Sequence, residues 1–313
     1  MPTIIKLAKT TDELKDVMHV RYRSMKEKKR EPHHIYNQTE MLSDHFDVYP
    51  NTLNIVAYYQ GEAVATLRAL VYSNSEKVLN FIFDYRDAHK QIGEGCYIID
   101  MLAILDSCDY KDVVLEQLFK VLMNILGHRN AKKIFFNCPK GLYPFFEHYS
   151  HVKLADEFNH LNYNNITPCS FDVKDFYNTF VSAVSDREIL RFQEVFYNVI
   201  FGPGEILVVQ GEKGASAYLI EGGTVEVLIQ TDDGILPVSE IGPGNLIGEI
   251  AMVTSEVRTA SIMAKTVTTC IAFDRDDFMN IMYENPNKAM DIFKIFSKRL
   301  SASNKKIAEL SRK

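Results

Sequence analysis

Two charged residues stand in a short apolar stretch near the C-terminus, and their types suit a small anion that carries hydroxyl groups. Glu249 and Arg258 lie nine positions apart in IGEIAMVTSEVRTASIM, residues 247–263. An arginine can donate two parallel N–H groups to a phosphate, and a carboxylate can accept a sugar hydroxyl. Gly248 would let the main chain approach such a ligand closely. Taken alone, an acid and a base at this spacing are more often a surface ion pair.

Composition limits what else the chain could be. It has 313 residues, enough for two domains, with 46% apolar and 24% charged residues. The net charge of −6 and the lack of a helix-turn-helix pattern argue against nucleic-acid binding. No signal peptide and no apolar run of about 18 residues is present, so no integral membrane segment is expected. Five scattered cysteines favour free thiols and therefore a cytoplasmic protein.

The first half alternates between helical and strand-like patterns, which predicts an α/β domain over residues 1–170. TTDELKDVMHVRYRSMKEKK reads as a helix with Thr10 or Thr11 at its start. A hairpin around Gln60–Gly61, a central strand in CYIIDMLAIL and a long helix in YKDVVLEQLFKVLMNILGHRNA follow. KKIFFNC is a further strand and LYPFFEHYS a short helix.

The second half, residues 171–313, changes rhythm. SDREILRFQEVFYNV carries a capping-box signal at Ser185 and Glu188, which predicts a short helix. Seven or eight short β runs between Gly-rich turns then follow from Phe201 to Phe273, a spacing typical of an antiparallel sandwich or barrel. The chain is expected to end in helices, broken at Asn285–Pro286.

This second half resembles the cyclic-nucleotide-binding domain, an antiparallel β-roll (jelly-roll-like) with flanking C-terminal helices. The matching motifs are F-x-x-G-E from Phe201, Q-G at Gln210, Y-L-I-x-x-G from Tyr218, and GPGNLIGE leading into RTAS. The resemblance implies a phosphate-binding cassette made of Gly248, Glu249, Ile250, Ala251, Arg258, Thr259 and Ala260.

The cassette suggests a role for each end. Arg258 would hold the cyclic phosphate, together with main-chain N–H groups if residues 249–251 open a helix. Glu249 would accept the ribose 2′-hydroxyl, and Thr259 could donate to the phosphate or to a guanine amino group. The ligand is expected to be cAMP, with cGMP as the alternative. The resemblance implies a terminal helix that closes over the base, where Ile307 or Leu310 could cover it or simply pack as ordinary helix residues.

The first half resembles the GNAT fold with its mixed sheet, and within it the N-acyl amino acid and acyl-homoserine-lactone synthases. The residues that carry this likeness are Arg21, the pair Asp44 and Asp47, and Arg68. The resemblance implies transfer of an acyl group from a thioester to an amine. The aspartates would bind the ammonium group, while Arg68 would pair with a substrate carboxylate or orient the aspartates. The aspartate pair and Arg68 could equally be a structural set of ion pairs.

Two positions depart from these enzymes. The E-x-x-R of the central strand is replaced by Ile98 and Met101, which leaves Asp100 as a substitute base or as a hydrogen-bonded core residue. The glycine-rich pyrophosphate loop is replaced by KDVVLE, residues 111–116. The donor could therefore be acyl-CoA or an acyl-carrier protein.

The sequence thus predicts a cyclic-nucleotide receptor whose ligand regulates an attached N-acyltransferase domain. The alternative is a non-catalytic signalling protein whose degenerate first domain binds a partner or lipid. No metal is expected, because His33, His34 and His45 match no metal-ligand spacing. The sequence assigns neither the oligomeric state nor the sign of regulation.

Overall fold

The computed structural model divides the chain into two compact units, Thr3–Ser182 and Ala183–Lys313, the latter together with Met1–Pro2. The structure describes residues 2–28, 39–49, 51–71, 93–147, 149, 151–154, 156–160, 164–176, 197–249, 254, 256–276, 279, 283 and 290. None of the helices in these ranges is long and apolar enough to cross a membrane. Each unit is taken by itself.

The N-terminal unit is built on one mixed sheet. Its elements are β1 (Thr3–Leu7), α1 (Thr11–Glu27), η1 (His45–Val48), β2 (Leu53–Tyr59), β3 (Glu62–Val71), β4 (Cys96–Ile104), α3 (Lys111–His128), β5 (Lys133–Pro139), η3 (Lys140–Leu142), α4 (Tyr143–Phe146), β6 (Val152–Lys153), β7 (Phe158–His160) and β8 (Asn164–Asp172). The strands run in the order β1-β2-β3-β4-β5-β8-β6, with β7 also paired to β8. Only β4 and β5 are parallel among these pairs.

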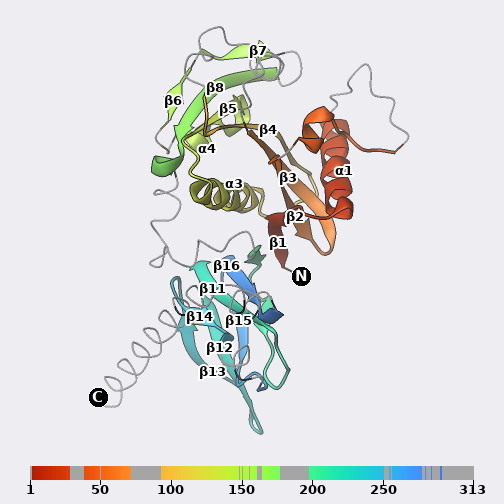
Figure 1. Ribbon diagram of the computed structural model, residues 1–313. Coiled ribbons are helices and arrows are strands. Elements are labelled where there is room, and N and C mark those ends of the chain that lie inside the picture. Colours follow the sequence, from red (N-terminus) through yellow and green to blue (C-terminus); the bar gives the residue numbers. More distant parts are fainter. Residues whose placement is uncertain are drawn as a thin grey trace. The chain divides into compact units, whose positions relative to one another are not determined.

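Helices cover both faces of this sheet. Successive residues of β2 and β3 are buried, as expected of central strands covered on two sides. Figure 1 shows α1 and α3 on either side of the sheet. Val17 and Val20 of α1 pack on Val56 and Ala103. This arrangement holds the strand ends rigidly, and the polar residues described below lie on them.

Both long helices form where the sequence predicts them, but they begin differently. Thr10 is the N-cap of α1, and its side chain and that of Glu13 form a complete capping box. In contrast, α3 follows Tyr110, which has left-handed backbone angles and no side-chain cap. The start of α3 therefore has neither a glycine nor a polar cap to complete an anion-binding turn.

Strand β4 loses one neighbour in its middle. It pairs with β5 only from Cys96 to Ile99, although both strands continue. Its register with β3 shifts between Thr66 and Arg68, and Met101 has a positive φ of 50°. This is a β-bulge, which bends the strand and re-aims side chains. Asp100 is thus the first residue of β4 beyond its pairing with β5.

The C-terminal unit is a β-roll of two antiparallel sheets. Its strands are β9 (Tyr197–Phe201), β10 (Ile206–Val208), β11 (Ser216–Gly222), β12 (Val225–Thr231), β13 (Gly234–Ile241), β14 (Leu246–Ile247), β15 (Ser261–Ala264) and β16 (Thr268–Asp274). One sheet has the order β14-β11-β16-β9 and the other β10-β15-β12-β13.

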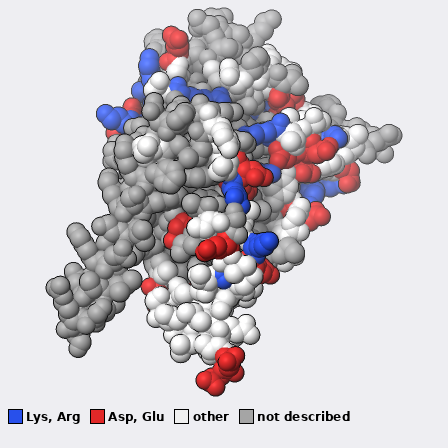
Figure 2. Space-filling view, turned by 60° about the horizontal axis from the view of Figure 1, so that its bottom comes forward, with Lys and Arg blue, Asp and Glu red and all other residues white. Residues whose placement is uncertain are grey.

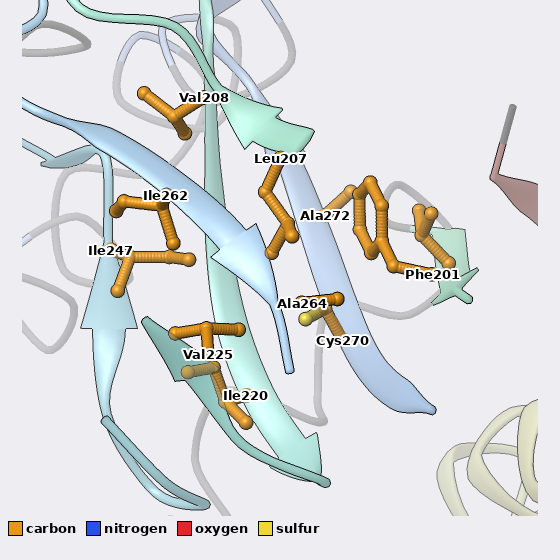
Figure 3. Packing of buried hydrophobic residues seen from close by; sticks show 11 residues of the cluster. Phe201, Leu207, Val208, Ile220, Val225, Ile247, Ile262, Ala264, Cys270 and Ala272 are labelled. Atoms are coloured by element: carbon orange, nitrogen blue, oxygen red, sulfur yellow. The ribbon is translucent and has the colours of Figure 1, made fainter. Parts of the chain in front are cut away.

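Apolar side chains from both sheets form the core of this unit (Figure 3). Phe201, Ile220 and Ile247 come from the first sheet, and Leu207 and Val225 from the second. Because side chains alternate along each strand, one face of each sheet points inward. This alternation fixes the register between β11 and β16.

Most expected elements are confirmed, and one is wrong. The helix predicted through residue 199 is contradicted at its end, because Tyr197–Phe201 is strand β9. The sequence reading also missed β1 and β8, and α4 is shorter than expected. The helix start at Ser185 and the lid residues Ile307 and Leu310 lie outside the described residues.

Candidate functional sites

The first site is centred on Arg68, whose five N–H donors all bind aspartates. Nε donates to Asp100 Oδ1 at 2.8 Å. Nη1 donates to Asp44 Oδ1 at 2.7 Å and to Asp47 Oδ1 at 2.9 Å. Nη2 donates to Asp44 Oδ2 at 2.9 Å and to Asp100 Oδ2 at 2.7 Å. Because a guanidinium has five donors in all, none is left for a substrate carboxylate.

Arg21 joins the same cluster from α1. Its Nη1 donates to both carboxylate oxygens of Asp47, at 2.9 and 3.0 Å, and its Nη2 donates to Asn54 Oδ1 at 2.5 Å. Among the described residues, its buried Nε has no hydrogen-bond partner. All five residues named from the sequence thus lie together, and Asn54 completes the group.

Local structure explains why distant residues meet here. The sheet register pairs Asn54 of β2 with Arg68 of β3, and Arg68 with Asp100 of β4, so the three stand in one row. Asp44 and Asp47 belong to the turn of η1, where each accepts a main-chain N–H in a reciprocal capping box. The D-x-x-D spacing therefore serves the turn and the arginines at once.

The cluster carries one negative charge in excess, since two arginines face three aspartates. Burial would raise the pKa of Asp47, but Arg21 and Arg68 outweigh burial and lower it. At Asp100 burial prevails over Arg68, and the pKa is raised. Of these two carboxylates, Asp100 therefore holds a proton more readily than Asp47.

The cysteines do not offer a nucleophile. All five are buried and free, which confirms the expectation of free thiols. Burial raises the pKa of Cys108 to about 11 and that of Cys169 to about 12. Because the thiolate is the reactive form, these two thiols stay unreactive at neutral pH.

The second site is centred on Arg258, which is only 7% exposed. Its Nη1 donates to the carbonyl oxygen of Gly248 and its Nη2 to that of Ser216, both at 2.5 Å. Across the described residues, no carboxylate forms an ion pair with it. Burial lowers the pKa of Arg258, while Tyr218 and Glu249 raise it by a smaller amount. Carbonyl oxygens are neutral acceptors, so these two bonds do not neutralise the positive charge of the buried guanidinium.

Two glycines make room for this guanidinium. A Cβ at Gly214 would lie 2.1 Å from Nε and Nη2 of Arg258. A Cβ at Gly248 would lie 2.6 Å from Nη1, and Gly248 also has a φ of +78°. Any side chain at either position would push the guanidinium away. The slot is therefore shaped for one arginine conformation.

The other predicted residues are neighbours of Gly248 and Arg258 in the sequence. Glu249 follows Gly248 and is helical. Thr259 is exposed and Ala260 half-buried, directly after Arg258. Ile250 and Ala251 lie outside the described residues. The structure thus brings Gly248, Glu249 and Arg258 to one end of the β-roll.

Sequence reasoning missed three contributors. Asn54 had a signal, an amide within the apolar strand LNIVAYY. Gly214 had a weaker one, the second glycine of GEKG. Ser216 contributes its carbonyl to Arg258, and a main-chain acceptor leaves no trace in residue type.

The arginines of the two sites do not appear as surface charge. On the face in Figure 2, basic side chains lie among acidic ones and form no continuous patch over the described residues. Arg68 and Arg258, at 0% and 7% exposure, are buried. Only ligands that enter a buried site could therefore meet them.

Two protein families match separate parts of the chain. Residues 198–285 match the family described as cyclic nucleotide-binding domain. Residues 16–167 match the family described as N-acyl amino acid synthase FeeM. The first range contains Arg258 and both glycines of its slot, and the second contains the whole Arg68 cluster. Both resemblances drawn from the sequence are confirmed.

Individual relatives match only in part. The cAMP-dependent protein kinase type II regulatory subunit of Drosophila melanogaster is 31% identical over 93 residues, which cover 30% of this chain and 25% of that protein. Lysophospholipase nte1 of Neurospora crassa is 31% identical over 100 residues, 32% of this chain and 7% of that protein. The chain thus spans a quarter or less of these relatives.

Among solved structures, a cyclic nucleotide-binding domain from Methylobacillus flagellatus KT is similar at 18% identity and a TM-score of 0.38. The match covers 53% of this chain and 88% of that one.

Proposed function

We propose that the chain is a cyclic-nucleotide receptor that controls acyl transfer, because residues 198–285 match the cyclic nucleotide-binding domain family and residues 16–167 match the N-acyl amino acid synthase FeeM family. The observation that carries this proposal is the state of Arg258, a buried guanidinium with only carbonyl partners among the described residues. No carboxylate of the described residues forms an ion pair with it, so an anionic ligand could balance its charge. The cytoplasm stays the expected location.

The receptor site would bind the ligand through its phosphate. The two carbonyls use one donor on each terminal nitrogen of Arg258, so each nitrogen keeps one N–H for phosphate oxygens. Main-chain N–H groups would add donors if residues 249–251 open a helix, as the sequence predicts. The carboxylate of Glu249 would accept the ribose 2′-hydroxyl. We expect cAMP rather than cGMP, and Thr259 is the residue that could favour guanine.

The catalytic step would take place at the Arg68 cluster, in a unit with the expected GNAT-like fold. Its excess negative charge favours a substrate ammonium, and Asp44 is its most open carboxylate, with a 20% exposed side chain. Asp100 stands where β4 leaves β5, so main-chain groups beyond it are free of that partner strand. An acyl thioester from acyl-CoA or acyl-carrier protein would enter there, as in related synthases.

The reaction can be written with its atoms balanced. Asp100 takes a proton from the ammonium group, and the free amine attacks the thioester carbonyl carbon. A C–N bond forms, the C–S bond breaks, and the thiolate leaves with the second amine proton. Main-chain N–H groups along β4 would stabilise the oxyanion. Arg68 would orient Asp44 and Asp100 and would not bind substrate, since its donors are occupied.

The test is an assay of thiol release by the full chain with acyl-CoA or acyl-carrier protein, an amine, and cAMP or cGMP. We expect turnover that changes when nucleotide is added. Asp100→Asn should lower it by roughly 10²–10⁴-fold, the usual loss when a general base is removed. Asp109→Asn, an exposed change in the loop that follows β4, is the matched control. Equal turnover in both variants would contradict the role of Asp100.

A second candidate is a receptor without catalysis, whose first domain binds a partner or lipid. Ile98 favours it, because this fully buried residue replaces the glutamate of related synthases. The start of α3 at Tyr110, without a glycine, points the same way. Nucleotide binding without thiol release from either donor would favour this candidate.

A further inference from the structure

Ser216 contacts the phosphate-site arginine with one end and a second polar group with the other. Its carbonyl oxygen accepts Nη2 of Arg258 at 2.5 Å. Its hydroxyl donates to Oδ1 of Asp274 at 2.6 Å. Ser216 is thus the single residue that connects the Arg258 guanidinium with the carboxylate of Asp274.

Asp274 lies where the chain enters and leaves the β-roll. It is the last residue of β16, and the next residue, Arg275, donates its main-chain N–H to the carbonyl of Ala215 at 2.7 Å. The same Oδ1 of Asp274 accepts the hydroxyl of Tyr197 at 3.3 Å. Tyr197 is the first residue of β9. One carboxylate oxygen therefore ties together the first strand, the last strand and the start of β11.

We infer that Ser216 is a positioning residue that transmits phosphate binding at Arg258 to both ends of the β-roll. The inference rests on the proposed function, since it needs a ligand at Arg258. An anion draws the guanidinium toward itself, and the hydrogen bond from Nη2 makes the Ser216 carbonyl follow. The hydroxyl of Ser216 then moves against Asp274, and Tyr197 and Arg275 respond.

The geometry favours this route over a general loosening of the strand. Ser216 and Asp274 are directly opposite each other in the β11–β16 ladder, so their side chains stay in contact when the strands shift together. The first segment reached, at Tyr197, continues the chain that comes from the N-terminal unit. The second, at Arg275, begins the segment beyond β16. A change that travels along the main chain beyond β9 or β16 passes through one of these two segments.

The test is amide hydrogen exchange of the full chain, with and without saturating cAMP, read at residues 197–201 and 274–276. Ser216→Ala removes the hydroxyl and keeps the carbonyl that holds Arg258. Ser239→Ala makes the same chemical change at an exposed position of β13 and is the control. We expect Ser216→Ala to keep far more cAMP affinity than Arg258→Ala, because it keeps the carbonyl that holds the guanidinium.

The change in amide exchange on adding cAMP, read at each of the two segments, should then distinguish the variants. In wild type and Ser239→Ala, cAMP should change exchange at both segments, and Ser216→Ala should lose this response at both. Tyr197→Phe should lose it at 197–201 and keep it at 274–276. A full response in Ser216→Ala would overturn the inference. So would a loss of affinity as large as that of Arg258→Ala, because the hydroxyl would then belong to the binding site itself.

Calorimetry on wild type separates this inference from the proposed function. If wild type binds neither cAMP nor cGMP, the receptor proposal fails and the inference fails with it. If wild type binds and responds while Ser216→Ala responds equally, only the role of Ser216 fails.

Discussion

Arg68 and Arg258 are both buried arginines, but their charges are compensated in opposite ways. Arg68 gives all five donors to three aspartates. Arg258 gives one donor from each terminal nitrogen to a carbonyl oxygen and, over the described residues, has no ion pair. The first charge is balanced within the protein. The second has no ion pair among the described residues, and in our proposal the phosphate of the ligand balances it.

The pKa shifts follow this difference. Burial disfavours the charge of both side chains. At Arg68 the bonds to Asp100 and Asp44 outweigh burial and raise the pKa, whereas at Arg258 burial prevails and lowers it. Breaking the bonds of Arg68 should therefore cost folding free energy, and removing Arg258 should cost ligand binding. The comparison predicts which property each substitution changes.

The largest effect is expected for Arg258→Ala. Two charge-assisted bonds to a phosphate at about 1.5–3 kcal/mol each correspond to a loss of cAMP affinity of roughly 10²–10⁴-fold. The free energy of unfolding should fall by less than in Arg68→Ala, because Arg258 gives up two hydrogen bonds to carbonyl oxygens and, among the described residues, no ion pair. Calorimetric titration and urea unfolding measure the two quantities. Lys265→Ala, which removes an exposed cation of the same β-roll, is the control. Unchanged affinity in Arg258→Ala would refute the assignment of the phosphate site.

Arg68→Ala should show the reverse pattern. Three carboxylates would lose their shared partner in a buried cluster, and breaking such a set costs about 3–5 kcal/mol. Urea unfolding of the N-terminal unit should register this loss, while cAMP affinity stays at the wild-type value. If Arg68→Ala is as stable as wild type, the aspartates are not held by this arginine as described.

The sequence predicted the members of both sites better than their partners. Arg21, Asp44, Asp47, Arg68 and Asp100 are spread over eighty positions, and only the family pattern related them before the sheet register brought them together. That Arg68 is saturated could not be predicted, because it depends on the orientation of three side chains. The carbonyl of Ser216 could not be predicted either, since every residue has one.

The missed elements have similar causes. TIIKL is only five residues long, too short to separate a strand from a leader to the following helix, yet it forms β1. FYNV continued an apolar helical pattern, but Tyr197–Phe201 pairs with β16 along the sheet. In both segments long-range pairing overrides local preference.

Gly214→Ala tests the shape of the Arg258 slot without removing its charge. Gly214 does not have the left-handed backbone that would itself strain an alanine, so the effect reports on the 2.1 Å contact of the new Cβ with the guanidinium. Overpacking of this kind costs about 1–3 kcal/mol, or roughly 5–150-fold in cAMP affinity. Gly242→Ala, where a Cβ meets nothing within 4 Å, is the matched control. Equal affinities for the two variants would show that the slot is wider than the contact implies.

The smallest effect is expected at Glu13. Its ion pair with Lys6 lies nearer the surface than those of Arg68, so breaking it should lower the free energy of unfolding by less. Burial raises its pKa, but Lys6 and the main-chain N–H groups of Lys9 and Thr10 outweigh it, and the pKa falls from 4.5 to about 2. Because the pKa of Glu13 is lower in the folded protein than in the unfolded one, its charge stabilises the fold at pH values above 4.5. This contribution is lost as the pH falls from 4.5 toward 2. Glu13→Gln should therefore lower the free energy of unfolding by about 1 kcal/mol at pH 7, the usual contribution of a cap. Urea unfolding at a series of pH values should show the gap between the two proteins closing in acid. A gap that stays constant would mean that shape, and not the charge of Glu13, supports the start of α1.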